Sequence, residues 1–116
     1  MPSAIFDRLD VVVVPFPFTD KAAVKRRPAL VLSDSATFNQ GAGHSVMTMI
    51  TSATENAWPH DVAITDLKSA GLSVPCALRF KFFTMDNRLV LRKAGKLGKT
   101  DREAVNIAAR AVLGMK

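Results

Sequence analysis

Three consecutive cations, Lys25, Arg26 and Arg27, stand directly before Pro28 and an apolar run. Proline is tolerated at the first residue of a strand, and it pushes the residue before it toward extended geometry. We therefore expect a strand over residues 29–33, with Arg27 held at its entrance. The three charges fit either of two roles: loop cations that keep a sheet edge soluble, or a site that binds an anion.

The two histidines, His44 and His60, are a second possible source of chemistry, and they stand on different predicted loops. Either could serve as an acid or base near neutral pH, or could be a loop residue with no chemical role. A metal site is not expected, because the sequence brings no further ligands near either histidine. The chain also has no glycine-rich phosphate loop, no paired cysteines and no His-x-x-x-His helix, so no cofactor is expected.

The length of 116 residues fits one domain spanning residues 1–116, large enough for a hydrophobic core without metal or disulfide bonds. The single cysteine, Cys76, cannot form an internal disulfide, and its apolar neighbours predict a packed thiol in a reducing compartment. A cytoplasmic location is therefore expected. No export segment is visible, and no apolar run approaches the roughly 18 residues that a membrane span needs.

The charge is strongly positive and uneven. Sixteen lysines and arginines against ten acids give a net charge of +6 and a pI of about 10.0. Eight of the cations, with only two acids, lie between Arg79 and Arg102, so this short stretch carries as much net charge as the whole chain. Such an excess on a small chain favours polyanionic or acidic partners, with nucleic acid first among them.

Apolar runs and period-two alternation predict five strands. They are expected at residues 10–18, 29–33, 45–51, 61–65 and 74–83. Within the last strand, Leu78, Phe80 and Phe82 alternate with cations. This alternation predicts a core face that holds the three apolar side chains and a wet face that holds Arg79 and Lys81.

The connections between these strands differ in character. Residues 19–27 form a polar, basic segment that is long for a tight hairpin, which is typical of a functional loop. Thr51 ends the third strand beside the polar loop 52–60. Residues 66–71 could form one helical turn ended by glycine. Residues 93–99 are expected to be a flexible basic connection.

The clearest helix lies near the C-terminus. Thr100 is a candidate N-cap, and Glu103, three residues later, completes a capping box. The residues that repeat at helical spacing and would pack on the sheet are Ala104, Ile107, Ala108, Ala111 and Val112. Strands first and a helix last predict a mainly β fold: a small, mostly antiparallel barrel or curled sheet with a covering C-terminal helix.

Four pieces in this order resemble the MazF/PemK family of bacterial toxin ribonucleases. They are Asp10 with its strand, Arg27-Pro28, Ile50-Thr51-Ser52 and the segment 78–86, LRFKFFTMD. The resemblance spans nearly the whole chain. It implies an SH3-like or CcdB-like barrel, a homodimer, and metal-independent cleavage of single-stranded RNA that leaves a 2′,3′-cyclic phosphate and a 5′-hydroxyl.

The resemblance also implies roles for two residues. Arg27 matches the family's arginine before proline, which stabilises the phosphate charge and transfers a proton to the leaving oxygen. Thr51 matches the threonine that hydrogen-bonds the same phosphate; taken alone, it would be a strand-end hydroxyl that caps its own backbone. The acidic stretch that many members carry before the arginine is missing here. The base is therefore undetermined, and the candidates are Asp20, His60 and Asp61.

Substrate binding falls to cations, polar groups and one aromatic residue: Lys25, Arg26, Ser52, Trp58, His60, Arg79 and Lys81. The cations would hold phosphates, while Trp58 would stack on a base, or would serve as a dimer contact, a partner-binding anchor or a lid. The family's antitoxin would offer an acidic, disordered segment that folds over this groove, and DNA would be contacted only through the antitoxin.

A rival hypothesis is a non-catalytic module of the same fold, either an RNA binder that has lost activity or a CcdB-like gyrase inhibitor. The missing acidic loop fits the first. The end of the chain argues against the second, because CcdB-type chains end in a Trp-Gly-Ile-like tail, whereas this one ends LGMK.

Overall fold

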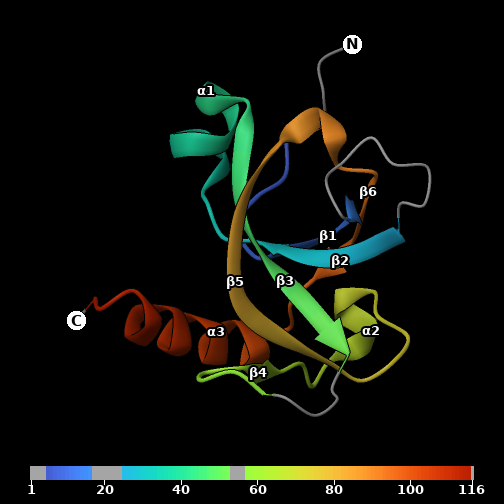
Figure 1. The fold of residues 1–116 in the computed structure, drawn as a ribbon, viewed down its shortest axis with the longest axis vertical. Coiled ribbons are helices and arrows are strands. Elements are labelled where there is room, and N and C mark those ends of the chain that lie inside the picture. Colours follow the sequence, from blue (N-terminus) through green and yellow to red (C-terminus); the bar gives the residue numbers. More distant parts are fainter. Residues whose placement is uncertain (1–4, 17–24, 53–56, 116) are drawn as a thin grey trace.

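The computed structural model describes residues 5–16, 25–52 and 57–115. Its strands form one antiparallel sheet in the order β4-β5-β3-β2-β1-β6. The strands are β1 (Asp10–Phe16), β2 (Lys25–Val31), β3 (His44–Ser52), β4 (Val62–Ala63), β5 (Cys76–Asp86) and β6 (Arg92–Lys96). The α-helices are α1 (Gln40–Ala42), α2 (Leu67–Ala70) and α3 (Lys99–Val112). Figure 1 shows the sheet curling along the long strands β3 and β5, with α3 across one end, which confirms the predicted fold class.

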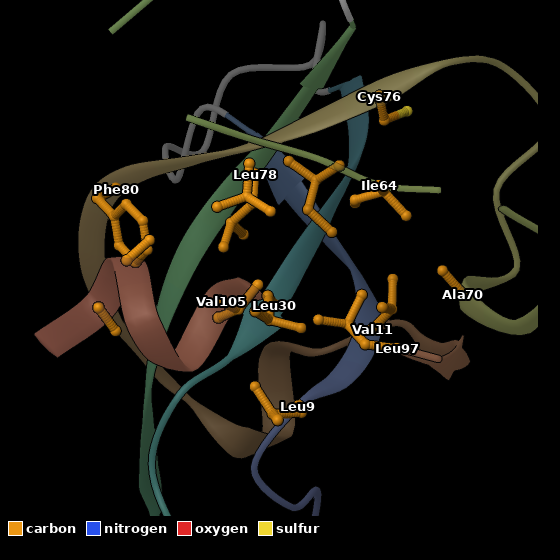
Figure 2. Close-up of a cluster of buried hydrophobic side chains, with 14 residues drawn as sticks. Leu9, Val11, Leu30, Ile64, Ala70, Cys76, Leu78, Phe80, Leu97 and Val105 are labelled. Atoms are coloured by element: carbon orange, nitrogen blue, oxygen red, sulfur yellow. The ribbon is translucent and has the colours of Figure 1, made fainter. Parts of the chain in front are cut away.

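Two hydrophobic clusters hold the curled sheet together. The larger packs the inner face of the sheet, including Leu30 and Leu78, against Val105 of α3 (Figure 2). The second lies on the other face of β1 and β2 and includes Val12 and Val14. Because β1 contributes to both clusters, it is apolar at successive positions rather than alternating, which explains its run of valines.

β2 begins at Lys25, not at residue 29 as predicted. Lys25, Arg26 and Arg27 are therefore strand residues, paired with Phe16, Pro15 and Val14 of β1. The predicted placement of residues 25–27 in the loop before the strand is therefore wrong. The ladder between β2 and β3 covers only residues 29–31 of β2, so within the described residues the first half of β2 is paired with β1 alone. A proline is tolerated in such a half-paired segment, and the strand continues through Pro28.

The ladder between β3 and β5 contains a bulge. Met49 pairs with Arg79 while its neighbour Thr48 pairs with Phe82, so β5 has two extra residues at this point. Phe80 stays in the larger cluster, but Phe82, whose ring centre lies 5.8 Å from that of Phe80, is not part of the cluster and is 40% exposed. The predicted core position of Phe82 is therefore wrong. Because two extra residues keep the inward and outward alternation, Phe82 still shares a face with Thr48 and Leu30, but its side chain is exposed on that face.

The C-terminal helix differs from the prediction at its start and on its buried face. It begins at Lys99 after Gly98, and no side chain caps it, so Thr100 is not the N-cap. Asp101 is buried and accepts hydrogen bonds from the backbone N–H groups of Thr65 and Asp66. These hydrogen bonds orient the helix so that its buried face holds Asp101, Val105, Ala108 and Ala109. Ile107 is 72% exposed, and Ala111 and Val112 also face outward, contrary to the prediction.

The predicted helical turn at residues 66–71 is confirmed as α2. The Asp66 side chain caps its start by accepting a hydrogen bond from Ser69 N–H at 3.0 Å, and Gly71 ends it with a φ of 72°. By contrast, the expected flexible connection at residues 93–99 is mostly the edge strand β6, paired with β1. No described helix has the length and apolar character needed to cross a bilayer.

Candidate functional site

A cavity of about 300 Å³ opens where β2 and β3 separate. The ladder between these strands ends at the pair Ala29 and Met49. Beyond that pair the strands diverge, toward the start of β2 and the end of β3, with α2 near the end of β3 (Figure 1). The lining residues come from these strands, from β1, β5 and β6, and from the segment after α2; the polar ones among them are Arg26, Arg27, Thr51, Ser52, Ser73 and Arg92.

The pocket is rich in positive charge. Three arginines line it: Arg26 and Arg27 from β2, and Arg92 from β6. Three hydroxyl side chains join them, and among the described residues no aspartate, glutamate or histidine lines the pocket. Guanidinium groups stay charged at all physiological pH values and bind phosphate or carboxylate through paired hydrogen bonds. The pocket is therefore suited to an anion.

The two β2 arginines enter the pocket from opposite faces of their strand. Arg27 is paired with Val14, which is buried in the second cluster, whereas Arg26 and Pro28 face the other side. Both nevertheless line the pocket, which opens where β2 leaves β3 and is bordered by both faces of the strand. Arg27 and Thr51 are each half-buried, so a ligand bound there would be partly removed from water.

Two glycines set the wall of the pocket that follows α2. A Cβ atom at Gly71 would lie 2.1 Å from the Ala94 carbonyl oxygen, and one at Gly95 would lie 2.2 Å from the Ser69 carbonyl oxygen. The backbones of α2 and β6 can approach this closely only because neither glycine carries a side chain. Ser69 Oγ also donates to the Lys96 carbonyl at 2.9 Å. The lining segment 71–74 is thereby held against β6.

Trp58, Asp61 and Arg79 form a separate cluster beside the pocket. Arg79 Nη2 lies 3.1 Å from Asp61 Oδ2, and Arg79 Cζ lies 5.3 Å from the centre of the Trp58 ring. The backbone N–H of Trp58 donates to the same carboxylate at 2.9 Å. The Trp58 side chain is 45% exposed. An aromatic ring with one face supported by a guanidinium can present its other face to a ligand.

The two described candidate bases lie outside the pocket lining. Burial raises the pKa of Asp61, but hydrogen bonds from the Arg79 side chain and the Trp58 backbone outweigh it, and the pKa lies below its usual value. A carboxylate held in this way is a weak base. The His60 side chain is exposed, and its backbone lies in the left-handed region with a φ of 64°. Asp20 lies outside the described residues.

Of the three remaining predicted substrate-binding residues, one lies in the pocket and two do not. Ser52 lines the pocket with Thr51, whereas Lys25 and Lys81 are exposed and do not line it. Cys76, buried as expected, contributes to the lining, and burial raises the pKa of its thiol. Among the described residues, no group of three His, Cys, Asp or Glu side chains could hold a metal ion.

Arg92 and Ser73 line the pocket but were missed by the sequence analysis. Arg92 stands within the basic stretch that begins at Arg79, yet nothing in that stretch marks it out from its neighbours. Its place depends on the pairing of β6 with β1, a contact between segments about 80 residues apart. Ser73 is placed by the close packing at Gly71 and Gly95, and no sequence motif indicates this packing.

A family model for the PemK-like, MazF-like toxin of type II toxin-antitoxin systems matches residues 7–113. Among solved structures, a MazE–MazF complex from Deinococcus radiodurans has a TM-score of 0.75 at 23% identity, covering 97% of this chain and 100% of that chain. An endoribonuclease in complex with its cognate antitoxin from a mycobacterial species has a TM-score of 0.72 at 16% identity, covering 100% and 98%.

The Mycobacterium tuberculosis toxin MazF-mt6 has a TM-score of 0.69 at 16% identity, covering 92% of this chain and 98% of that chain. A search of curated proteins found no match. At these identities the similarity to the solved structures supports only the fold. The family match runs from before β1 to the end of α3 and so includes every strand that borders the pocket. On that match, the chain belongs to the PemK-like, MazF-like toxins of type II toxin-antitoxin systems.

Proposed function

We propose that this toxin is an endoribonuclease that cleaves single-stranded RNA, with the scissile phosphate bound in the pocket between β2 and β3. The observation that carries the proposal is that Arg27 and Thr51, which lie far apart in the sequence, line one pocket together. That pocket contains arginines and hydroxyls, the groups that bind phosphate, and no acid among its described residues. An RNA substrate also suits the net charge of +6.

In the proposed reaction the ribose 2′-oxygen loses its proton and attacks the adjacent phosphorus. The bond from phosphorus to the 5′-oxygen breaks, and that oxygen takes up a proton, which leaves a 2′,3′-cyclic phosphate and a 5′-hydroxyl. The phosphate gains negative charge in the transition state, so preorganised donors aimed at its oxygens lower the barrier. We assign this stabilisation to Arg27 and Thr51, and the proton for the leaving oxygen to Arg27.

The base that takes the 2′-hydroxyl proton is not among the described lining residues. Asp61 is engaged by Arg79, and neither Asp61 nor His60 lines the pocket. Asp20, outside the described residues, is the remaining candidate of the three. A correctly placed base contributes about 10²- to 10⁴-fold in rate, so this protein would be a slow enzyme if no group fills the role. No metal ion is required by this scheme.

We assign recognition of the RNA outside the scissile phosphate to the face of β3 and β5 next to the pocket. Thr51 pairs with Ala77 and Met49 pairs with Arg79, so Thr51 and Arg79 lie on the same face of the sheet, about two residues or 7 Å apart along the strands. An RNA chain leaving the pocket across this face would meet the exposed Trp58 ring. Stacking of a base on that ring contributes about 1–3 kcal/mol.

The same surface also supports a proposal about the antitoxin. The solved structures of two similar proteins hold a MazE or cognate antitoxin. We propose that the antitoxin of this protein covers the pocket with an acidic segment that folds on binding, since three arginines there would attract it. We also propose that the toxin is a homodimer and that it meets DNA only through the antitoxin.

The test is cleavage of a long mixed-sequence RNA in the presence of EDTA. We expect discrete fragments with cyclic phosphate ends, and we expect Arg27→Ala to abolish them while the far-UV circular dichroism is unchanged. Arg102→Ala, at an exposed position of α3 outside the pocket lining, is the matched control and should cleave normally. Uncut RNA with wild-type protein would contradict the proposal.

One rival function has support from a specific observation. Because no acid lines the described part of the pocket, the protein could bind RNA without cutting it. Tight binding of RNA with no fragments after prolonged incubation would select this non-catalytic binder. Trapping of DNA gyrase in a cleavage complex would instead select a gyrase inhibitor.

A further inference from the structure

The third arginine of the pocket, Arg92, has no role in the scheme above. It is exposed at the start of β6, and it lines the pocket from a strand that β1 separates from β2. Val13 of β1 pairs with Pro28 on one side and with Arg92 on the other, so these three residues face the same side of the sheet. Arg92 therefore shares a face with Arg26, while Arg27 lies on the opposite face of β2; β2 and β6 are two strand spacings apart, about 10 Å.

Two neighbouring cations are paired with acids, whereas Arg92 is paired with no acid among the described residues. Lys93 Nζ lies 3.3 Å from Asp10 Oδ1, and Arg88 Nη2 lies 2.7 Å from Asp86 Oδ2. Within the described residues, the Arg92 side chain forms no ion pair or hydrogen bond with any acid. Three guanidinium groups thus border one cavity without an acid among its described lining, and a bound anion would relieve their mutual repulsion.

We propose that Arg92 binds a second phosphate of the RNA, the one next to the scissile phosphate, so that the pocket holds two successive phosphates of one strand. This rests on the proposed function, in which Arg27 and Thr51 hold the scissile phosphate. A single phosphate is bound by a guanidinium in close, paired hydrogen bonds. Arginines that approach from strands about 10 Å apart therefore serve neighbouring phosphates of a chain better than they serve one phosphate. Arg92 is a substrate-positioning residue in this scheme.

The test measures binding rather than cleavage, using 2′-O-methyl RNA, which has no attacking hydroxyl. Fluorescence anisotropy of a labelled hexanucleotide is followed from 50 to 250 mM NaCl for the wild type, Arg92→Ala, Arg92→Lys and Arg102→Ala. Each phosphate neutralised on a single strand contributes about 0.7 to the slope of log K against log salt concentration. We expect Arg92→Ala to lower the slope by about 0.7, and Arg92→Lys and Arg102→Ala to keep the wild-type slope.

A second comparison uses ligand length. A dinucleotide has one phosphate and a trinucleotide has two, so the wild type should gain affinity with the second phosphate. Arg92→Ala should lose that gain and bind the dinucleotide as the wild type does. An unchanged salt slope in Arg92→Ala, or an equal loss on both ligands, would overturn the assignment.

The failure of the enzyme proposal has a different signature. If the wild type binds RNA but does not cut it, the proposed function fails while the salt slopes still decide whether Arg92 holds a phosphate. Equal thermal unfolding midpoints of Arg92→Ala and wild type would show that any loss of binding is local.

Discussion

The guanidinium of Arg79 lies 3.1 Å from the carboxylate of Asp61, and both side chains are largely shielded from water. The pair joins β5 to the turn before β4. It also holds the backbone of Trp58, because Asp61 accepts a hydrogen bond from the Trp58 N–H. Asp61, one of the three candidate bases, therefore also supports an aromatic side chain. This relationship separates the proposed reaction site in the pocket from the proposed recognition surface beside it.

The first prediction concerns Asp61→Asn. Because Asp61 lines no part of the pocket, the maximal cleavage rate should stay close to that of the wild type. RNA affinity should fall several-fold, since Arg79 loses the Asp61 carboxylate and Trp58 is held less firmly. Single-turnover cleavage at saturating RNA measures the rate. A loss of 10²- to 10⁴-fold in rate would instead identify Asp61 as the base.

The second prediction concerns Trp58→Ala. Loss of one base stack should weaken RNA binding by about 1–3 kcal/mol, or roughly 5- to 150-fold in the dissociation constant, with little change in the maximal rate. Phe38→Ala is the matched control, because Phe38 is 41% exposed and lies on the helical turn 35–39 away from the pocket lining. Equal effects of the two substitutions would argue against a stacking site at Trp58.

Much of the fold could be predicted from the sequence because its signals are local. The valines of β1, the alternation at the start of β5 and the glycine that ends α2 each act through near neighbours. The features that were missed are set by distant contacts. The bulge in β5 depends on how β5 pairs with β3, and the rotation of α3 depends on Asp101 reaching back to residues 65 and 66.

In the candidate site, too, residues marked by local sequence signals were predicted, whereas residues placed by distant contacts were not. Arg27 and Thr51 were identified because a proline and a strand end mark their positions and because their order matches a known family pattern. Lys25 and Arg26 were placed in a loop, since the sequence does not show that β2 continues through Pro28. Arg92 could not be found, because its position depends on β6 joining the edge of the sheet at β1.

The third prediction concerns the pH dependence of stability through Asp101. Burial raises the pKa of this carboxyl group, but hydrogen bonds from Asp66 and Thr65 outweigh it, and the pKa lies below its usual value. A group whose folded pKa is depressed stabilises the protein above its unfolded pKa, about 3.9, and loses that contribution as the pH falls through the folded value. Asp101→Asn should therefore lower the free energy of unfolding more at pH 7 than at pH 3.

Urea unfolding at the two pH values measures this difference. The loss at pH 7 should be about 2 kcal/mol, the size of hydrogen bonds made to a charged group. Glu103→Gln is the control, because Glu103 is exposed two residues further along the same helix. A loss that is as large at pH 3 as at pH 7 would mean that packing, and not the charge of Asp101, stabilises the start of α3.

The fourth prediction links stability to activity through Gly95. An alanine there would place its Cβ 2.2 Å from the Ser69 carbonyl oxygen, and this backbone atom cannot move without shifting α2. We expect a loss of about 1–3 kcal/mol in stability, the usual cost of overpacking. We also expect weaker RNA binding, because segment 71–74, which follows α2, lines the pocket.

Gly41→Ala is the matched control for that substitution. A Cβ at Gly41 meets nothing within 4 Å, and the residue lies in α1, away from the pocket lining, so alanine should leave RNA binding unchanged and stability equal or slightly higher. Urea unfolding and RNA titration of both variants provide the measurements. If Gly95→Ala lost stability but kept full RNA affinity at a temperature where it is folded, the wall after α2 would have no part in holding the substrate. The close contact between α2 and β6 would then serve the fold alone.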